Sequence, residues 1–264
     1  MPADRKPPGP QPARSRVTWI GHATALLEIG GARVLTDPVL RRRLAHLRRR
    51  GADPPAEARR EVTAVLISHL HHDHLDLPSL RMLGAGTPIV APRGAGRMLR
   101  RAGFTSVDEI AAGESLRLGG AVLRAWPAVH DGRRGRWGDR APALGFVVEG
   151  GGRSVYFAGD TDLFPEMEEL ARPRLDLALL PVWGWGPTLG AGHMDPRRAA
   201  DAAALIRPRV AVPIHWGTLY PAALHRLRPR ALTDPPHAFA GAVARVAPGV
   251  GVEVLPPGGA LGLD

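Results

Sequence analysis

Residues 62–74 read Val-Thr-Ala-Val-Leu-Ile-Ser-His-Leu-His-His-Asp-His, an apolar run that ends directly in a cluster of histidines. The near-continuous apolar stretch Val62–Ser68 predicts a strand that is buried on both faces. Imidazole and carboxylate groups crowded into so few residues repel or dehydrate one another unless a cation is bound between them. The stretch therefore predicts a metal site on a loop after a buried strand, with these ligand candidates: His69, His71, Asp73 and His74.

The spacing of this loop suggests how the ligands divide. Alternate side chains point the same way, so His69 and His71 are expected to bind one ion, and Asp73 and His74 a neighbouring ion. The chain contains no cysteine, which excludes disulfides, thiolate ligands and a cysteine nucleophile. Nitrogen and oxygen ligands suit zinc, which we expect first, with manganese and iron as alternatives.

The pattern H-x-H-x-D-H resembles the motif of the metallo-β-lactamase-fold hydrolases. Further motifs follow in the order of that family, and what they imply is carried over by resemblance. Asp37, in Leu-Thr-Asp-Pro, is similar to the early aspartate that supports the histidine loop without binding metal. His130 is similar to the third histidine of the first ion. Asp160 is similar to the carboxylate that bridges both ions, and His215 to the last ligand of the second ion. The resemblance implies an α/β protein folded as a four-layer αββα sandwich.

Three short motifs resemble one branch of this superfamily, which includes L-ascorbate-6-phosphate lactonase and N-acylphosphatidylethanolamine-hydrolysing phospholipase D. They are Gly-His-Ala-Thr at 21–24, Gly-His-Met-Asp-Pro at 192–196 and His-Trp-Gly-Thr at 215–218. The resemblance implies that His193 lies beside the metals and contacts the substrate or leaving group. His22 is expected on a turn that faces the cleft. For both histidines, the alternative is a hydrogen-bonding role behind the ligands.

These residues predict a hydrolase in which two divalent ions, about 3.5–4 Å apart, share a hydroxide that attacks phosphorus or a carbonyl carbon. Asp73, as a ligand, and His193, as proton donor to the leaving oxygen, are the residues expected to take part in catalysis. The expected substrate is a small molecule, with an anionic compound as one option: a phosphodiester, an ester or a lactone. The alternatives are a metallo-nuclease acting on RNA or DNA, a metal-binding protein without catalysis and an antibiotic-hydrolysing β-lactamase.

The charge of the chain is a weak guide to its partners. The formal net charge is +10, yet Lys6 is the only lysine among the 35 basic residues. So strong an arginine bias, beside abundant Ala, Gly and Pro, is typical of genome-wide codon composition, and we expect no nucleic-acid partner. The N-terminus lacks an apolar signal segment, and no stretch is apolar enough to span a membrane, so a cytoplasmic protein is expected.

Arginine and tryptophan side chains near the motifs each have two interpretations. The runs 41–43 and 48–50 lie in a predicted loop, 37–60, and are either solvated or part of a phosphate-binding lid. Arg133, Arg134, Arg136 and Arg140 follow His130 and are either solvated or able to clamp an anion. Trp126, Trp183, Trp185 and Trp216 either line the substrate pocket or pack in the core.

Two parts of the chain are predicted, a disordered tail at 1–16 and one domain at 17–264. Helices are expected from Asp76, over 94–102, over 195–206 and over 234–246. The helices at 76 and 195 begin with a capping aspartate and a nearby proline, and the helix over 234–246 has an apolar face. Strands are expected at 17–21, 24–29, 33–36, 62–68, 88–91, 121–128, 143–149, 154–158, 175–181, 210–213 and near the end, within 252–263.

Overall fold

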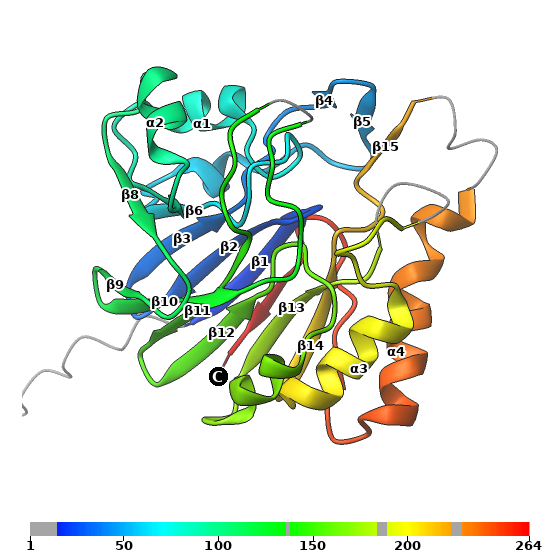
Figure 1. Cartoon of the computed structure of the whole chain (residues 1–264). Coiled ribbons are helices and arrows are strands. Elements are labelled where there is room, and N and C mark those ends of the chain that lie inside the picture. The colour runs from blue at the N-terminus through cyan, green and yellow to red at the C-terminus, as the bar shows by residue number, and fades with distance from the viewer. Residues whose placement is uncertain (1–14, 136–137, 184–188, 223–228, 264) are drawn as a thin grey trace, which may run out of the picture.

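The computed structural model describes residues 15–135, 138–183, 189–222 and 229–263. Two seven-stranded sheets lie face to face, and helices cover their outer surfaces (Figure 1). The first sheet has the order β17-β1-β2-β3-β6-β7-β8. Its strands are β1 (Arg16–Gly21), β2 (Thr24–Ile29), β3 (Ala32–Thr36), β6 (Ala64–Leu66), β7 (Ile89–Pro92), β8 (Val107–Ile110) and β17 (Ala260–Gly262).

The second sheet has the order β16-β14-β13-β12-β11-β10-β9. Its strands are β9 (Ser115–Leu118), β10 (Ala121–Pro127), β11 (Leu144–Gly150), β12 (Arg153–Phe157), β13 (Leu177–Pro181), β14 (Val210–Ile214) and β16 (Gly251–Val252). Each sheet is antiparallel on one side and parallel on the other. The parallel halves are β3-β6-β7-β8 and β12-β13-β14-β16.

The main core lies between the two sheets. Large side chains from both inner faces are fully buried there, among them Trp19, Leu27, Phe146 and Phe157. Burial of each such side chain contributes about 1.5–3 kcal/mol, so this interface is the main source of stability.

Separate apolar clusters fill the two outer faces. One lies between the first sheet and helices α1 (Leu77–Leu83) and α2 (Gly96–Arg101). The other lies between the second sheet and α3 (Pro196–Ile206), α4 (Asp234–Val246) and the 3-10 helix η2 (Pro165–Ala171). This arrangement confirms the predicted αββα sandwich.

Two helix starts formed as the sequence predicts. The Asp76 carboxylate accepts the backbone N–H of Ser79 at the start of α1. The Asp195 carboxylate accepts the N–H groups of Arg197 and Arg198 at the start of α3. In both helices a proline occupies the first turn, where its missing N–H costs nothing.

The prediction of a loop over 37–60 was wrong, because part of this segment forms strands. Strands β4 (Arg43–Leu44) and β5 (Leu47–Arg49) form a hairpin there, which pairs with β15 (Leu219–Pro221) in a third sheet. The 3-10 helix η1 (Ala56–Arg59) follows, and another, η4 (Pro229–Leu232), precedes α4.

Two arginines of the basic runs are structural, against both predicted interpretations. Arg49 is 5% exposed, and its guanidinium donates to the backbone carbonyls of Ile20 and Val39. Arg41 forms a two-pronged pair with Asp76, at 2.8 and 2.7 Å. The positive charges of these two residues are therefore used inside the chain.

The first strand begins one residue before the strand predicted at 17–21. Strand β1 starts at Arg16, and the carbonyl of Ser15 accepts the N–H of Leu263. In the described part of the chain, none of the helices combines the length and apolar character needed to cross a lipid bilayer.

Candidate metal centre

The candidate ligands converge because each lies in a turn or loop at or just beyond a strand end. His22 lies on the turn between β1 and β2, and the histidine loop 69–74 follows β6. The second sheet contributes His130 after β10, Asp160 after β12 and His215 directly after β14. Loops at the ends of a rigid scaffold can aim side chains into one place, and here both sheets contribute to one centre.

A first group of three imidazoles consists of His69, His71 and His130. The Nδ1 atom of His71 lies 3.0 Å from His69 Nε2 and 3.1 Å from His130 Nε2. Burial lowers the pKa of His130 to about 4 and holds that of His69 well below its ordinary value. Both rings are therefore neutral near pH 7, as a metal ligand must be.

The outer ring nitrogens fix the tautomers of two of these histidines. His130 Nδ1 lies 2.8 Å from the Gly192 carbonyl, which can only accept a hydrogen bond. His69 Nδ1 lies 3.0 Å from Ser68 Oγ, whose own proton is donated to Asp37. Both Nδ1 atoms therefore carry hydrogen, and both Nε2 atoms present a lone pair.

These lone pairs meet in a way that favours a cation. His71 Nδ1 can donate one proton at most, and it faces two acceptors. At least one close nitrogen–nitrogen pair is therefore left without a hydrogen between its atoms. A cation placed among the three nitrogens removes this repulsion, so the residues fit a metal ion.

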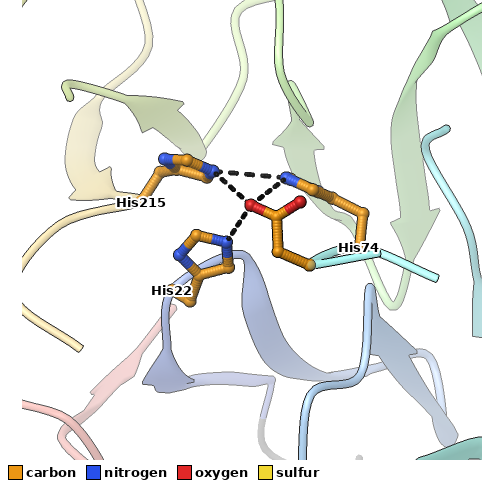
Figure 2. A group of neighbouring side chains, drawn as sticks. His22, His74 and His215 are labelled. Carbon is orange, nitrogen blue, oxygen red and sulfur yellow. Dashed lines mark hydrogen bonds and ion pairs between the residues drawn. The ribbon is translucent and has the colours of Figure 1, made fainter. Parts of the chain in front are cut away.

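A second group contains Asp73, His74 and His215, with His22 beside them. His74 Nε2 and His215 Nε2 are 3.2 Å apart, and each lies 3.9 Å from Asp73 Oδ2 (Figure 2). The outer nitrogens are again held: His74 Nδ1 lies 2.6 Å from Asp37 Oδ2, and His215 Nδ1 lies 2.6 Å from the Trp183 carbonyl. Such outer contacts orient imidazole ligands in metalloproteins.

Asp160 lies between the two groups. Its Oδ2 atom is 3.3 Å from both His74 Nε2 and His215 Nε2, and the residue also belongs to a cluster with His130 and His193. Its Oδ1 atom is buried without a hydrogen-bond partner among the described residues. A buried, unpaired carboxylate oxygen is costly unless a cation compensates it, which again fits a metal ion.

The charges around His74 lead to the same conclusion. Burial alone would lower its pKa, but the carboxylates of Asp160, Asp37 and Asp73 raise the pKa well above the ordinary value. Burial likewise opposes ionisation of Asp160, yet His215 and His74 hold the Asp160 pKa well below its ordinary range. A proton on His74 thus balances the buried carboxylates, and a divalent ion could replace it.

His193 lies at the more exposed side of the centre. Its side chain is 26% exposed, and Nε2 lies 3.5 Å from Asp160 Oδ2. The ring stands edge-on to His130, with ring centroids 4.7 Å apart. The hydrogen bond to Asp160 raises the pKa of His193 above its ordinary value, so its imidazolium can donate a proton near pH 7.

The tryptophans divide between packing and the neighbourhood of the centre. Trp216 stacks on the buried Trp19 with ring centroids 5.0 Å apart, and Trp126 packs in the cluster under α3, which fits the packing alternative for both. Trp183 stacks on Tyr220 and offers its carbonyl to His215. Trp185 and Arg136 lie outside the described residues.

Sequence reasoning missed the support that Arg134 gives to the histidine loop. Arg134, one of the candidate anion-clamping residues, instead donates from one terminal nitrogen to the carbonyls of Leu70 and Leu75, at 3.0 and 2.8 Å. It therefore ties together the two ends of the histidine loop. Its neighbour Arg133 is paired with the exposed Asp131.

Gly192 was quoted in a motif, but its own role was not predicted. Its φ of +80° is in the region that favours glycine. A Cβ at this position would lie 3.0 Å from both the Cα and Nδ1 atoms of His130. The glycine before His193 therefore lets the backbone carbonyl approach His130, which is a signal that the sequence does carry.

Comparisons with known proteins identify the family of the chain. Residues 32–216 match the β-lactamase superfamily domain. A UPF0173 metal-dependent hydrolase of Opitutus terrae is 34% identical, over 92% of this chain and 97% of that protein. The N-acyl-phosphatidylethanolamine-hydrolyzing phospholipase D 1 of Caenorhabditis elegans is 32% identical, over 77% of this chain and 64% of that protein.

A solved structure extends the likeness to three dimensions. Igni18, a metallo hydrolase of the archaeon Ignicoccus hospitalis, superposes with a TM-score of 0.73 at 25% identity, covering 96% of this chain and 99% of its own. The fold, the clustered histidines and aspartates and the sequence relatives lead to one assignment. The chain belongs to the metallo-β-lactamase-fold family of metal-dependent hydrolases.

Proposed function

We propose that this metal-dependent hydrolase works with two divalent ions that are bridged by Asp160. The observation that carries the proposal is the position of Asp160 between two groups of ligands. His69, His71 and His130 would hold the first ion. Asp73, His74 and His215 would hold the second, and Asp37 would support the histidine loop without binding metal.

The ligand set favours zinc, with manganese and iron as alternatives. Five imidazoles and two carboxylates make up the proposed set, and each residue type is a usual zinc ligand. When bound, two such ions acidify a shared water and supply hydroxide at neutral pH. Asp160 would keep the two groups at a fixed separation, because its carboxylate is buried and is held by His74 and His215.

His193 would protonate the leaving oxygen of the substrate. Its side chain is partly exposed, so a substrate can reach it, and its Nε2 atom faces the same carboxylate that bridges the ions. Its raised pKa keeps the donating form populated at neutral pH. The bond cleaved would belong to a small phosphodiester, ester or lactone.

The proposal is tested by elemental analysis of metal content in the wild type and in Asp160→Asn. The same samples are assayed with bis-p-nitrophenyl phosphate, an aryl ester and a lactone. About two ions per chain in the wild type are expected. In Asp160→Asn, both metal content and hydrolysis should fall. The control is His72→Ala, since His72 is exposed in the same loop and belongs to neither ligand group.

Each outcome has a distinct meaning. The model substrate preferred by the wild type separates phosphodiester from ester or lactone chemistry. Wild type that retains one ion or none after reconstitution contradicts the two-ion proposal. Full metal occupancy without hydrolysis of these substrates, together with salt-sensitive retention on RNA, would instead favour the nuclease alternative.

A further inference from the structure

The His22 ring is built into the second ligand group. The residue lies on the turn between β1 and β2, is 2% exposed, and its Nε2 atom lies 3.1 Å from Asp73 Oδ2. Its ring centroid is 3.9 Å from that of His215 and 5.4 Å from that of His74. In Figure 2 the His22 ring turns one nitrogen toward the place where His74 and His215 meet.

The backbone fixes His22 in this position. Its φ is +56°, a left-handed conformation that non-glycine residues adopt rarely and that often marks functional sites. The carbonyl of His22 accepts the indole N–H of Trp19 at 2.9 Å and the N–H of His215 at 3.0 Å. Its own N–H donates to Thr218 Oγ1 at 3.0 Å. The ring is therefore placed by the fold itself.

The turn can come this close only because of the residue before His22. Gly21 has a φ of +124°, and a Cβ there would lie 2.7 Å from the methyl group of Thr218. The β1–β2 turn of the first sheet is thus pressed against the loop that follows β14 of the second sheet. This contact brings His22 and His215, which are far apart in the sequence, into one ligand group.

The distances within this group leave a place for an ion beside His22. Asp73 Oδ2, His74 Nε2 and His215 Nε2 form a triangle with sides of 3.2, 3.9 and 3.9 Å. The centre of such a triangle is about 2.1 Å from each corner, close to the usual zinc–nitrogen and zinc–oxygen distances. An ion near that centre has its three neighbours in one plane, so it has room for ligands above and below.

We infer that His22 Nε2 is an additional ligand of the second metal ion. This inference rests on the proposed function. A ring nitrogen of His22 lies within 4.8 Å of the ligand atoms of Asp73, His74 and His215, as the ligands of one ion must, and its Nε2 atom is 3.1 Å from Asp73 Oδ2. With Asp160, the second ion would have five protein ligands, a number that zinc accepts. The first ion would keep three imidazoles and Asp160, so the two ions would differ in coordination.

The test is a metal titration of His22→Asn with Co²⁺, followed by visible absorption spectroscopy. Asparagine tolerates a positive φ, so the turn is preserved, but its shorter side chain cannot reach the ion. The weak band of five-coordinate Co²⁺ at the second site should become more intense, as four-coordinate Co²⁺ absorbs more strongly. The dissociation constant of the second ion should rise at least about 10-fold, while the first ion is unaffected.

The matched control is His72→Asn, which removes an exposed imidazole from the histidine loop and should change neither spectrum nor affinity. A further variant, His22→Gly, suits the positive φ and leaves a space for free imidazole, which should restore the wild-type spectrum. Recovery of the spectrum by imidazole supports a metal–nitrogen bond rather than a structural role for the side chain.

Two failures are distinguishable. A second ion that binds to His22→Asn with the wild-type spectrum overturns this inference, and shows that His22 only donates a hydrogen bond to Asp73. In that case the two-ion proposal stands. A wild type that takes up one Co²⁺ ion and no second overturns the two-ion proposal itself.

Discussion

Asp37 Oδ2 lies 2.6 Å from His74 Nδ1, and both side chains are fully buried. The same carboxylate accepts the N–H and the hydroxyl of Ser68, at 2.7 and 2.5 Å. Asp37 thus receives three hydrogen bonds at the base of the histidine loop. All of its donors belong to that loop or to the residue before it, so Asp37 sets the position of a ligand from behind.

Asp37→Asn should weaken metal binding. An amide has one acceptor oxygen and turns two hydrogens toward donors, so at least one buried donor is left unpaired. We expect metal affinity to fall about 10- to 100-fold, as measured by competition with a chromophoric chelator. The free energy of unfolding should fall by about 1–3 kcal/mol in a denaturant titration.

A similar carboxylate far from the centre provides the control. Asp176 accepts the N–H and the hydroxyl of Ser154, at 2.9 and 3.3 Å, on the second sheet. Asp176→Asn should lower stability but leave metal affinity unchanged. Equal losses of metal affinity in the two variants would mean that Asp37 acts only through overall stability.

Metal binding should release protons and become tighter as the pH rises. The buried carboxylates around His74 keep its pKa well above the ordinary 6.5, so His74 is protonated at neutral pH without metal. An ion must displace this proton before His74 can bind it. Calorimetric titration in buffers of different ionisation enthalpy should therefore show proton release, and no dependence on the buffer would contradict the assignment of His74 as a ligand.

The stability of the metal-free protein should show the opposite trend with pH. The raised pKa of His74 means that its stabilising contribution is complete below the unfolded value of 6.5 and is lost as the pH rises through the folded value. The lowered pKa of Asp160 means that its contribution is present above 3.8 and is lost as the pH falls through its folded value. With a chelator present, the melting temperature should therefore be highest between pH 3.8 and pH 6.5, where both contributions are complete.

His193→Gln should slow catalysis without removing metal. His193 belongs to neither proposed three-residue ligand group, so metal content should stay near the wild-type level. Loss of a proton donor typically costs about 10²- to 10⁴-fold in rate. The loss in kcat should be larger for alkyl esters, whose leaving oxygen needs a proton, than for p-nitrophenyl esters. Equal losses for both would assign His193 to substrate binding instead.

Arg134→Gln should loosen the histidine loop, because the guanidinium joins the carbonyls of Leu70 and Leu75. Removing these hydrogen bonds should cost about 1–3 kcal/mol of stability and lower metal affinity. Arg133→Gln is the matched control at the neighbouring residue, since Arg133 pairs with an exposed aspartate on its own loop. Its effect should be within about 0.5 kcal/mol.

The elements that the sequence predicts well are those with local signals. The helix over 234–246, predicted from its amphipathic face, and the start of the helix at Asp195, predicted from a capping aspartate and a proline, were both confirmed. The short strands β4, β5, β8, β9 and β16 were missed. They have two to four residues and owe their conformation to neighbouring strands, which no local pattern reveals.

In the metal centre, too, features with a local sequence signal could be predicted, and those set by distant parts of the chain could not. A dense cluster such as His69 to His74 is visible in the sequence, and the structure brings it together with His130, Asp160 and His215. The support from Arg134 could not be predicted, because its partners are backbone carbonyls, which are the same at every position of a sequence. At position 192 the sequence carries a signal, the glycine itself, but not the carbonyl's partner. Arg49 was read as solvated or phosphate-binding, since nothing local distinguishes a surface arginine from one buried between loops.

The proposed ligands come from both sheets of the sandwich, and this has a mechanical consequence. A chain without cysteine has no covalent cross-link, and an ion held by His74 and His215 would join residues that are 141 positions apart. An ion that binds the folded chain at 1,000 times its dissociation constant adds about 4.1 kcal/mol of stability. The metal would then link the two sheets at the strand ends that carry the ligands. When the metal is removed, the two sheets should separate there first.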